Sequence, residues 1–396
     1  MDLLEDARAQ QDDLVRLRRT LHADPEIGLK LPRTQERVLA ELAELPLTLT
    51  TGAAGLSSVV GVLRGGRSSG RSVLLRADMD ALPVAEETGL DFAAANGAMH
   101  ACGHDLHTSM LVGAARLLSA HRDELGGDVI FMFQPGEEGY DGARHMVEAG
   151  VLDAAGARPE AAFFMHVTSS TFPSGTVAVR PGPMMSAADV LHVSVVGSGG
   201  HASAPHRAQD PIAVAAEIVT ALQTLVTRQF DVFDPVVVTV GSFHAGSQHN
   251  IIAERATFEA TVRSFSPEHQ KAISERAVRL CRGIAEAHGL RADVDWQTLY
   301  PVTRNDPDQA AFLADTVAAM FGEPAAVLMP NPHTGSEDFS RVLDEVPGAM
   351  AFLGATLPGR DPATAPFNHS PLAIFDEGVL SSGAALYAQL AVDRLA

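Results

Sequence analysis

Several scarcities in this 396-residue sequence exclude whole classes of protein. Only two cysteines occur, Cys102 and Cys281, which excludes a disulfide framework and suits a reducing cytoplasm. Basic residues are also few, 29 against 49 acidic ones, and the net charge of −20 argues against binding to nucleic acid or anionic membranes. No apolar run reaches the roughly 18 residues of a spanning helix. The acidic N-terminus lacks the basic start of a signal peptide. We therefore expect a cytoplasmic globular protein with neither nucleic acid nor membrane as a partner.

The first part of the chain alternates predicted strands with helices. Apolar residues at helical spacing predict a helix over residues 3–22, and another is predicted over roughly 105–121. The predicted strands are Ser58–Leu63, Ser72–Ala77, Asp128–Phe133 and Ala161–His166. This alternation favours an α/β fold with a mixed, mostly parallel sheet and helices on both faces. The Gly/Ser-rich segment Arg64–Arg71 is interpreted as a hairpin tip.

The pattern changes near residue 186. Predicted elements follow in the order strand, helix, strand, strand, helix, strand, which is the ferredoxin-like α+β arrangement. Their ranges are Ala188–Val196, Pro211–Thr227, Pro235–Ser242, Ile251–Phe265, Pro267–Gly289 and Leu290–Trp296. The α/β pattern resumes after Pro301, with helices over roughly 308–321 and 377–394 and a strand near Ala349–Leu353. We therefore predict one domain from residues 1–185 and 300–396, and an inserted domain from residues 186–299.

Metal-capable side chains are concentrated in four short segments of the first domain. Three of them follow predicted strands: Asp78-Met79-Asp80, Gln134-Pro135-Gly136-Glu137-Glu138 and His166. The fourth, Cys102-Gly103-His104-Asp105, comes just before a helix. Ligands of open α/β sheets collect at the carboxyl ends of strands, so we expect these segments to meet at one edge.

The residue types in these segments suit a metal centre. Thiolate and imidazole favour zinc and similar metals, and carboxylate also accepts manganese. Gly103 lets the chain turn so that Cys102 and His104 reach one cluster, with Glu138 and His166 as further ligands. The neighbouring carboxylates of Glu137 and Glu138 point in different directions, so one can bind metal while the other acts as a general base on water held between two metals.

Each feature has a plainer interpretation when it is taken alone. A single buried cysteine is usually a small hydrophobic residue, and a Glu-Glu pair is usually solvated surface. His107 and His100 are interpreted as structural residues outside the ligand set. Asp78 and Asp80 are not both expected to be ligands, and one of them would orient a ligand. The joint occurrence of the four segments favours the metal centre.

The sequence resembles the metallopeptidase-like amidohydrolases, which include hippurate hydrolase, bacterial N-acyl-amino-acid amidohydrolases and plant auxin-conjugate hydrolases. The resemblance spans nearly the whole chain. It is carried by the segments Leu21–Glu26, Arg76–Pro83, Met99–Asp105, Gln134–Glu138, Gly200–Ser203, His333–Phe339 and Asn368–Pro371.

The resemblance implies two divalent transition metal ions, manganese, zinc, cobalt or nickel. It implies one ligand that the residues alone do not indicate, His369. The implied ligand set is Cys102, His104, Glu138, His166 and His369. Glu137 takes the role of catalytic base. The residues Asp78, Asp80 and Asp105 are expected to hold the ligands in position without binding the metals themselves.

The resemblance also gives the inserted domain the role of a lid and dimerisation domain. His201 matches the histidine that polarises the scissile carbonyl, in some relatives in the neighbouring protomer's site. Asn250 and Arg263 match positions that hold the substrate, and arginine suits a carboxylate. His206 and His249 carry weaker expectations. Ser336-Glu337-Asp338 is expected to line or support the site, with no role assigned.

The leading hypothesis is hydrolysis of the amide bond of an N-acyl amino acid by a homodimer or dimer-based oligomer. A dipeptidase, or a deacylase of aminobenzoyl-glutamate or N-acyl-diaminopimelate, would share every catalytic residue. A non-catalytic metal-binding scaffold is disfavoured because Glu137 and His201 are both present. A redox thiol protein would need a resolving cysteine, and Cys281 lies in the other predicted domain.

Overall fold

The computed structural model describes residues 2–67 and 69–396, and these residues form two compact units. Unit 1 contains residues 2–184, 304–331 and 338–396, and unit 2 contains residues 185–303 and 332–337. No helix in the described part of the chain is long and apolar enough to cross a membrane.

Helices of unit 1 lie before, between and after the strands of its sheet. They are α1 (Leu3–Ala9), α2 (Gln11–His22), α3 (Pro32–Leu42), α4 (His104–Ala120), α5 (Glu137–Tyr140), α6 (Gly142–Glu148), α9 (Pro307–Phe321), α10 (Ser340–Leu343) and α11 (Val379–Leu395). The helix predicted over residues 3–22 is divided at Gln10, which caps α1 and precedes α2.

Unit 1 is built on an eight-stranded sheet with the order β1-β2-β4-β3-β5-β16-β6-β15. Its strands are β1 (Leu47–Thr51), β2 (Val59–Leu63), β3 (Ser72–Asp78), β4 (Asp128–Gln134), β5 (Ala161–Pro173), β6 (Val177–Val179), β15 (Ala326–Leu328) and β16 (Gly348–Thr356). The pairs β4–β3, β3–β5, β5–β16 and β6–β15 are parallel, whereas β1–β2, β2–β4 and β16–β6 are antiparallel. The mixed, mostly parallel sheet predicted from the sequence is confirmed.

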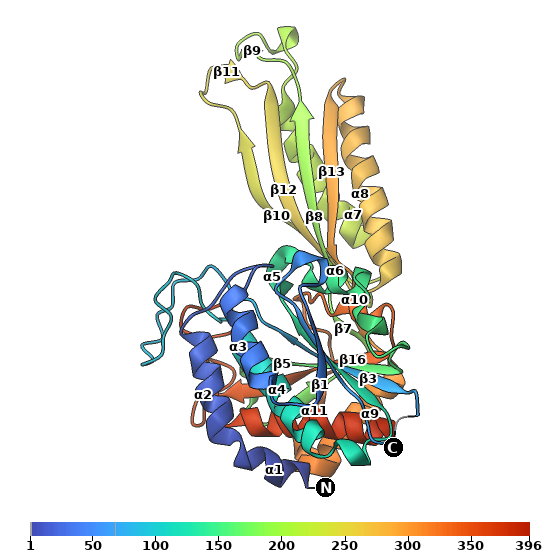
Figure 1. Cartoon of the computed structure of the whole chain (residues 1–396). Coiled ribbons are helices and arrows are strands. Elements are labelled where there is room, and N and C mark those ends of the chain that lie inside the picture. The colour runs from blue at the N-terminus through green and yellow to red at the C-terminus, as the bar shows by residue number, and fades with distance from the viewer. Residues whose placement is uncertain (1, 68) are drawn as a thin grey trace. The chain divides into compact units, whose positions relative to one another are not determined.

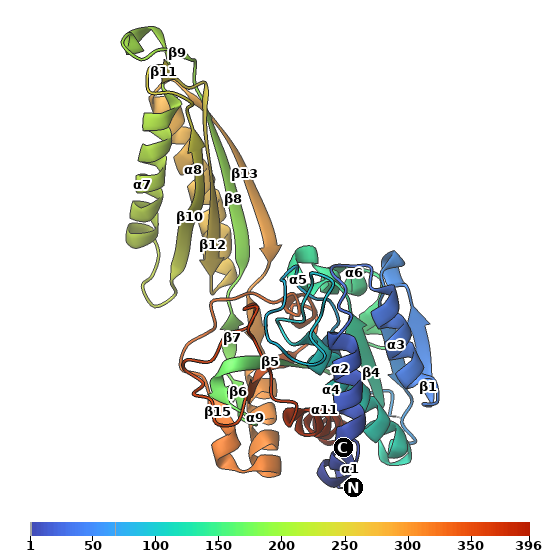
Figure 2. The same cartoon turned by 90° about the vertical axis from the view of Figure 1, so that its left-hand side faces the viewer.

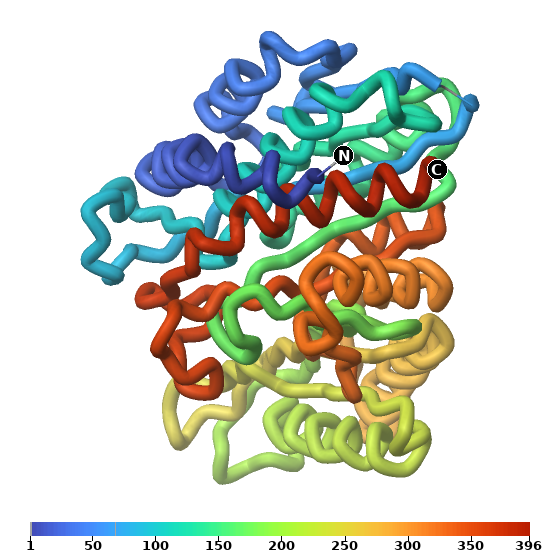
Figure 3. The backbone as a smooth tube through the Cα atoms, turned by 90° about the horizontal axis from the view of Figure 1, so that it is seen from below, coloured from blue at the N-terminus to red at the C-terminus, as the bar shows by residue number. Residues whose placement is uncertain are grey.

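Helices cover both faces of this sheet, as predicted. The long helices α4, α9 and α11 pack on one face, where alternate residues of the central strands join a single apolar core. The short helices α6 and α10 pack on the other face (Figure 1). The two ends of the chain come together, because α1 and α2 lie beside α11 (Figure 3).

The segment Arg64–Arg71 is not a hairpin tip, contrary to the sequence prediction. It connects β2 with β3, and β4 lies between these two strands in the sheet. Strand β2 therefore pairs with β4 in antiparallel fashion, and β3 pairs with β4 in parallel. The short Gly-rich connection resembled a hairpin because nothing in the segment itself shows that a later strand, β4, pairs between β2 and β3.

Strands β3 and β5 separate near their carboxyl ends. Their pairing stops at Arg76 and Phe164, although β3 continues to Asp78 and β5 continues to Pro173. The hydroxyl of Tyr387 on α11 fills the gap: it donates to the carbonyl of Arg76 at 2.8 Å and accepts from the backbone N–H of Met165 at 2.9 Å. This opening lies where the chain order in the sheet reverses, the position at which open α/β sheets bind ligands.

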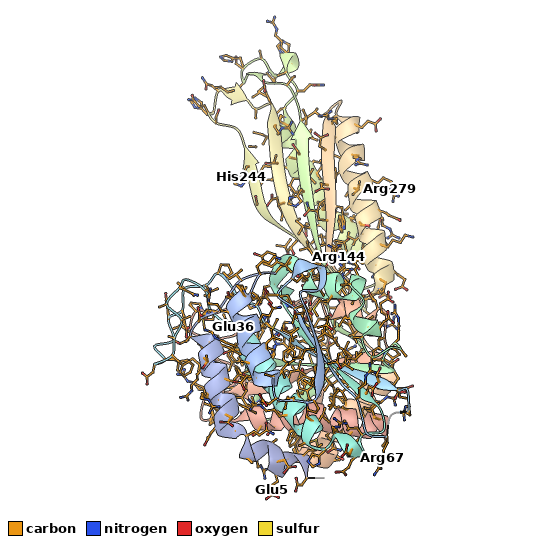
Figure 4. All side chains as sticks on the ribbon, in the orientation of Figure 1. Glu5, Glu36, Arg67, Arg144, His244 and Arg279 are labelled. Carbon is orange, nitrogen blue, oxygen red and sulfur yellow. The ribbon has the colours of Figure 1, made fainter. Side chains whose placement is uncertain are left out.

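Unit 2 contains an antiparallel four-stranded sheet with the order β10-β12-β8-β13. Its elements are β8 (Ala188–Val196), α7 (Pro211–Gln229), β10 (Val236–Ala245), β12 (Arg255–Ser264), α8 (Pro267–Ala287) and β13 (Arg291–Tyr300). Both helices lie on one face of the sheet (Figure 2), which confirms the ferredoxin-like prediction. The outer side of α8 is charged and exposed, as at Arg279 (Figure 4).

The remaining elements are short. Strand β9 (Gly200–His201) pairs with β11 (Ile251–Ile252) at the end of the unit 2 sheet where β12 begins (Figure 1). Strand β7 (Gly182–Met185) pairs with β14 (Thr303–Asn305). The segment Pro332–Glu337 clusters with unit 2, although it follows residues of unit 1 in the chain.

We predict that Tyr387→Phe lowers the free energy of unfolding by about 1–3 kcal/mol, because it leaves two buried backbone groups without their hydrogen bond. Urea unfolding followed by circular dichroism would measure the change. Tyr140→Phe is the matched control, because Tyr140 is 45% exposed. Its effect should stay within about 0.5 kcal/mol. Equal stability of the two variants would contradict a bridging role for the Tyr387 hydroxyl.

Candidate metal centre

The four metal-capable segments meet at the opening between β3 and β5. Asp78 ends β3, Gln134 ends β4, and His104 begins α4. The strand predicted to end at His166 instead continues to Pro173, so His166 projects from within β5. His369 comes from the loop that precedes α11.

Three overlapping groups consist only of the expected ligands and the expected base. Within each group the donor atoms lie within 4.8 Å of one another. The groups are Cys102 with His104 and His166, Cys102 with Glu138 and His369, and His104 with Glu137 and Glu138. All five ligands expected from the sequence, and the expected base Glu137, thus lie in one cluster of unit 1.

Two histidines of the cluster are oriented by backbone carbonyls. His104 Nδ1 donates to the carbonyl of Asp80, and His166 Nδ1 donates to the carbonyl of Val167, both at 2.8 Å. These bonds leave Nε2 of each ring directed into the cluster, where His166 Nε2 is 3.3 Å from Cys102 Sγ. A fixed ring with one free nitrogen is the usual state of a metal-ligating histidine.

The Cys102-Gly103-His104 turn depends on its glycine. Gly103 has φ +87°, and a Cβ atom there would lie 2.3 Å from a methyl group of Val167. Glycine therefore satisfies both the backbone conformation and the close approach to β5. The turn also receives hydrogen bonds from the His369 loop, because the His369 N–H donates to Ala101 and the Asn368 amide donates to Cys102.

Asp80 holds the turn that carries the two glutamates. Its carboxylate accepts the backbone N–H of Glu137 at 2.9 Å and that of Glu138 at 3.0 Å. The same residue orients His104 through its backbone carbonyl. The sequence analysis expected one aspartate to orient a ligand, and the structure shows that Asp80 does so with its main chain while its side chain binds the glutamate turn.

Asp78 belongs to a buried network behind the cluster. It accepts from His107 Nδ1 at 2.6 Å and from Arg76 at 2.7 Å, and it lies 3.6 Å from His104 Nε2. His107 Nε2 accepts the backbone N–H of Val167, so neither ring nitrogen of His107 is available for a metal. His100 is buried and joins no donor group among the described residues.

Asp105 follows His104 and points away from the cluster. Its carboxylate binds Arg18 and His22 of α2, both at 2.8 Å. Asp338 of the Ser336-Glu337-Asp338 segment instead binds Arg76 and the amide of Gln134. In unit 2, the carbonyl of Glu337 accepts from the hydroxyl of Thr303.

The cluster favours positive charge. Cys102 and Glu138 raise the pKa of His369 to about 10. Burial opposes the charged form of His104, but Asp78 and Asp80 outweigh burial and raise the pKa of His104 well above its ordinary value. Burial disfavours the charged form of Glu138, yet His369 and His104 lower the pKa of that carboxyl. A bound divalent cation would supply the positive charge in place of the bound protons.

The donor set fits a transition metal. His104 Nε2 and Glu138 Oε1 are buried, 3.8 Å apart, and neither makes a hydrogen bond within the described residues. Leaving such groups unpaired in a protein interior is costly unless a ligand satisfies them. Thiolate, imidazole and carboxylate donors together suit zinc, manganese, cobalt or nickel.

The unit 2 residues singled out by the sequence fall into two places. His201 on β9 pairs with Ile251, and the backbone of Asn250 bonds to Ala202, so His201 and Asn250 are neighbours. Both side chains are exposed, as are those of His206 and His249. Arg263 lies eight residues beyond Arg255 along β12, about 26 Å at ~3.3 Å per residue. It is half-buried and donates to its neighbour's carbonyl.

Sequence reasoning missed three residues that hold the cluster together. Asn368 donates to the carbonyls of Cys102 and Val167, Arg76 joins Asp78 to Asp338, and His22 binds Asp105. All three lie in segments that carry the family resemblance. Their partners are distant in sequence, so no local spacing could have identified the contacts.

Comparisons with known proteins agree with this geometry. Thermostable carboxypeptidase 1 of Saccharolobus solfataricus is 37% identical over 99% of this chain and 99% of its own length. N-acetylcysteine deacetylase of Bacillus subtilis is 36% identical over 96% of each chain. A solved Bacillus subtilis structure described as a dinuclear metal binding peptidase from the M20 family superposes with a TM-score of 0.82 at 32% identity, over 98% of this chain and 99% of that one.

The match to a family model covers most of the chain. Residues 74–393 match the model of peptidase family M20/M25/M40. This stretch includes every residue of the donor cluster. The chain belongs to peptidase family M20/M25/M40.

Proposed function

We propose that this protein is a metal-dependent amidohydrolase that cleaves N-acyl amino acids into an amino acid and a carboxylic acid. The observation that carries the proposal is the single cluster formed by Cys102, His104, Glu138, His166 and His369 with Glu137 beside it. Family membership and the similarity to a deacetylase support the reaction class. The related carboxypeptidase makes cleavage of a peptide's terminal amide bond, as in a dipeptidase, the second candidate. The deacylations of aminobenzoyl-glutamate and N-acyl-diaminopimelate would use the same residues.

Two divalent ions bound by the five ligands would polarise the amide carbonyl and lower the pKa of a water molecule. Glu137 is the residue placed to accept the proton of that water and to deliver it to the leaving nitrogen. It is 6% exposed, and Asp80 fixes its backbone, so its carboxylate has little freedom to turn away. The net reaction adds water across the C–N bond.

His201 and Arg263 would act on other parts of the substrate. The backbone N–H of Ser203 donates to His201 Nδ1, which leaves Nε2 to carry the proton and donate to an oxyanion. Arg263 would bind the free carboxylate through its planar fork, with Asn250 as a further polar contact.

The arrangement of unit 2 supports a homodimer. His201 and Asn250 lie at one end of the sheet and Arg263 lies near the other, separated by about 26 Å of strand. An N-acyl amino acid is far shorter than that distance. If all three residues serve one substrate molecule, they must come from two copies of the chain. Two free cysteines are consistent with a cytoplasmic location.

The metal centre predicts about two transition metal ions per chain. Cys102→Ala should lower that content, because it removes a ligand shared by two donor groups. Elemental analysis by mass spectrometry of purified protein would measure it. Cys281→Ala is the matched control, since Cys281 is buried in the core of unit 2, and it should leave the metal content unchanged. Unaltered metal in the Cys102 variant would remove this residue from the ligand set.

Activity should depend on Glu137. Release of amino acid from N-acetyl, N-benzoyl and indole-acetyl amino acids, compared with dipeptides, tests the proposed substrate class. Glu137→Gln should lower kcat by roughly 10²–10⁴-fold, because the proton then has no acceptor. The metal content should stay at the wild-type level, whereas Glu138→Gln should reduce it. Turnover of dipeptides alone would favour the second candidate, and an active Glu137→Gln variant would assign the base to another residue.

The dimer can be tested by mixing two inactive chains. A Glu137→Gln chain keeps His201, and a His201→Ala chain keeps Glu137. Heterodimers of the two, isolated with different affinity tags, should regain activity if His201 serves the site of the other copy. Each homodimer measured at the same concentration is the control. Heterodimers as inactive as both parents would show that the two residues act within one chain.

A further inference from the structure

The segment Leu21–Glu26, which carries part of the family resemblance, contributes no residue to the donor cluster. Its residues nevertheless contact the long connection between β3 and α4. That connection has no helix and only isolated bridges, and it ends at the ligands Cys102 and His104. Connections of this length without regular structure are uncommon in compact domains and usually have a function.

The connection contains a closed loop, Pro83–Ala98. Leu82 and Met99 exchange two backbone hydrogen bonds of 3.0 Å, which close the base of the loop. Only Ala98 of the loop is buried, so the loop has almost no apolar core of its own. Its order therefore depends on contacts with its surroundings, which include the Phe92 ring beneath Arg18 and Arg19 as well as polar contacts.

Glu86 makes the contacts at the centre of this loop. Its carboxylate accepts from the backbone N–H of Ala94 at 2.7 Å and lies 3.1 Å from His22 Nε2. The Glu86 side chain is 0% exposed although it belongs to a surface loop. A buried carboxylate of this kind needs a nearby positive charge.

His22 supplies that charge and connects Glu86 to the metal side. Its Nδ1 lies 2.8 Å from the Asp105 carboxylate and 3.3 Å from an Arg18 nitrogen, so both ring nitrogens face carboxylates. Burial lowers the pKa of His22, but Asp105 and Glu86 outweigh burial and raise it, which favours the doubly protonated ring. Arg18 also binds Asp105 at 2.8 Å, whereas no other cation is bonded to Glu86 within the described residues.

Other contacts place the same loop beside the metal ligands. The N–H of Glu87 donates to the carbonyl of Pro371, two residues after the ligand His369. The amide of Asn96 donates to the carbonyl of Pro25, next to Asp24 in the same motif as His22. The loop is therefore tied to the His369 segment on one side and to Leu21–Glu26 on the other.

We propose that His22 is a positioning residue that holds loop Pro83–Ala98 as a wall of the substrate site, by linking Glu86 of the loop to Asp105 at the start of α4. The substrate part of this proposal rests on the proposed function. Loss of His22 leaves Asp105 bound to Arg18 but leaves Glu86 buried without a cation. The loop should loosen while the metal ligands keep their places.

The test compares His22→Ala, Glu86→Ala and the double variant. Chymotrypsin can cut the loop at Leu90 and Phe92, which none of these changes alters. We expect each single variant to be cut roughly tenfold faster than the wild type, because local opening exposes the loop. The double variant should be cut no faster than either single one, since both break the same link. KM should rise roughly tenfold, while kcat and metal content change less than about twofold.

Two controls accompany these variants. Glu86→Gln retains an oxygen that can accept from Ala94 and His22, so it should restore most of the protection. Asp24→Asn changes the same motif, but within the described residues the Asp24 carboxylate bonds only to Arg33 and Arg37, so cleavage and KM should match the wild type.

Three results would overturn the proposal: wild-type cleavage rates in both single variants, additive effects in the double variant, or loss of metal with KM unchanged. Glu86→Ala lies in a surface loop, so it decides the matter if His22→Ala does not fold. If the wild type hydrolyses no N-acyl amino acid, the proposed function fails, and the cleavage rates alone decide whether His22 holds the loop.

Discussion

The separation of β3 from β5 beyond Arg76 and Phe164 is the constraint on which the donor cluster depends. Beyond this point β3 ends at Asp78 while β5 continues through His166, so both residues lie where the two strands no longer pair. The hydroxyl of Tyr387 satisfies the two backbone groups that separation would otherwise leave unpaired in the interior. The opening therefore exists without the cost of buried, unbonded amide groups.

Buried arginines and carboxylates form ion pairs around this opening. Arg76 and Arg18 are both almost fully buried, and each binds two carboxylates: Arg18 binds two from distant segments, and Arg76 binds Asp78 of its own strand and one from a distant segment. Arg76 joins β3 to Asp338, and Arg18 joins α2 to Asp105 and Glu377. Such pairs contribute little net stability compared with apolar packing, but removing one partner is costly. They restrict how the segments that carry ligands can shift.

Much of the fold was predictable from local patterns. Strands β8 and β4 and helices α4, α7 and α9 appear within a few residues of the predicted ranges, because alternating or helical apolar spacing marks each of them. The interpretation of Arg64–Arg71 as a hairpin tip was wrong because strand order depends on β4, which comes some sixty residues later and is inserted by long-range pairing. The continuation of β5 past His166 was also missed, because Thr168, Ser169 and Ser170 are buried but polar and give no apolar pattern.

The donor cluster likewise contains residues that could be predicted from the sequence and residues that could not. Four of its segments were predictable because the residue types are rare together and three of the segments lie at the ends of predicted strands. His369 required the family resemblance, since one histidine in a loop has no distinctive spacing. The residues behind the ligands, such as Asn368 and His22, could not be predicted, because their contacts join positions far apart in the chain.

The antiparallel strands of unit 2 fix the distance between two groups of polar residues. The distance between the polar residues near β9 and Arg263 is set by the number of residues in β12, at ~3.3 Å each. Deleting one residue would turn every following side chain to the opposite face of the sheet. Deleting two would restore the faces but shorten the span by roughly 7 Å. Strand length in this unit should therefore tolerate change less well than the identity of its exposed side chains.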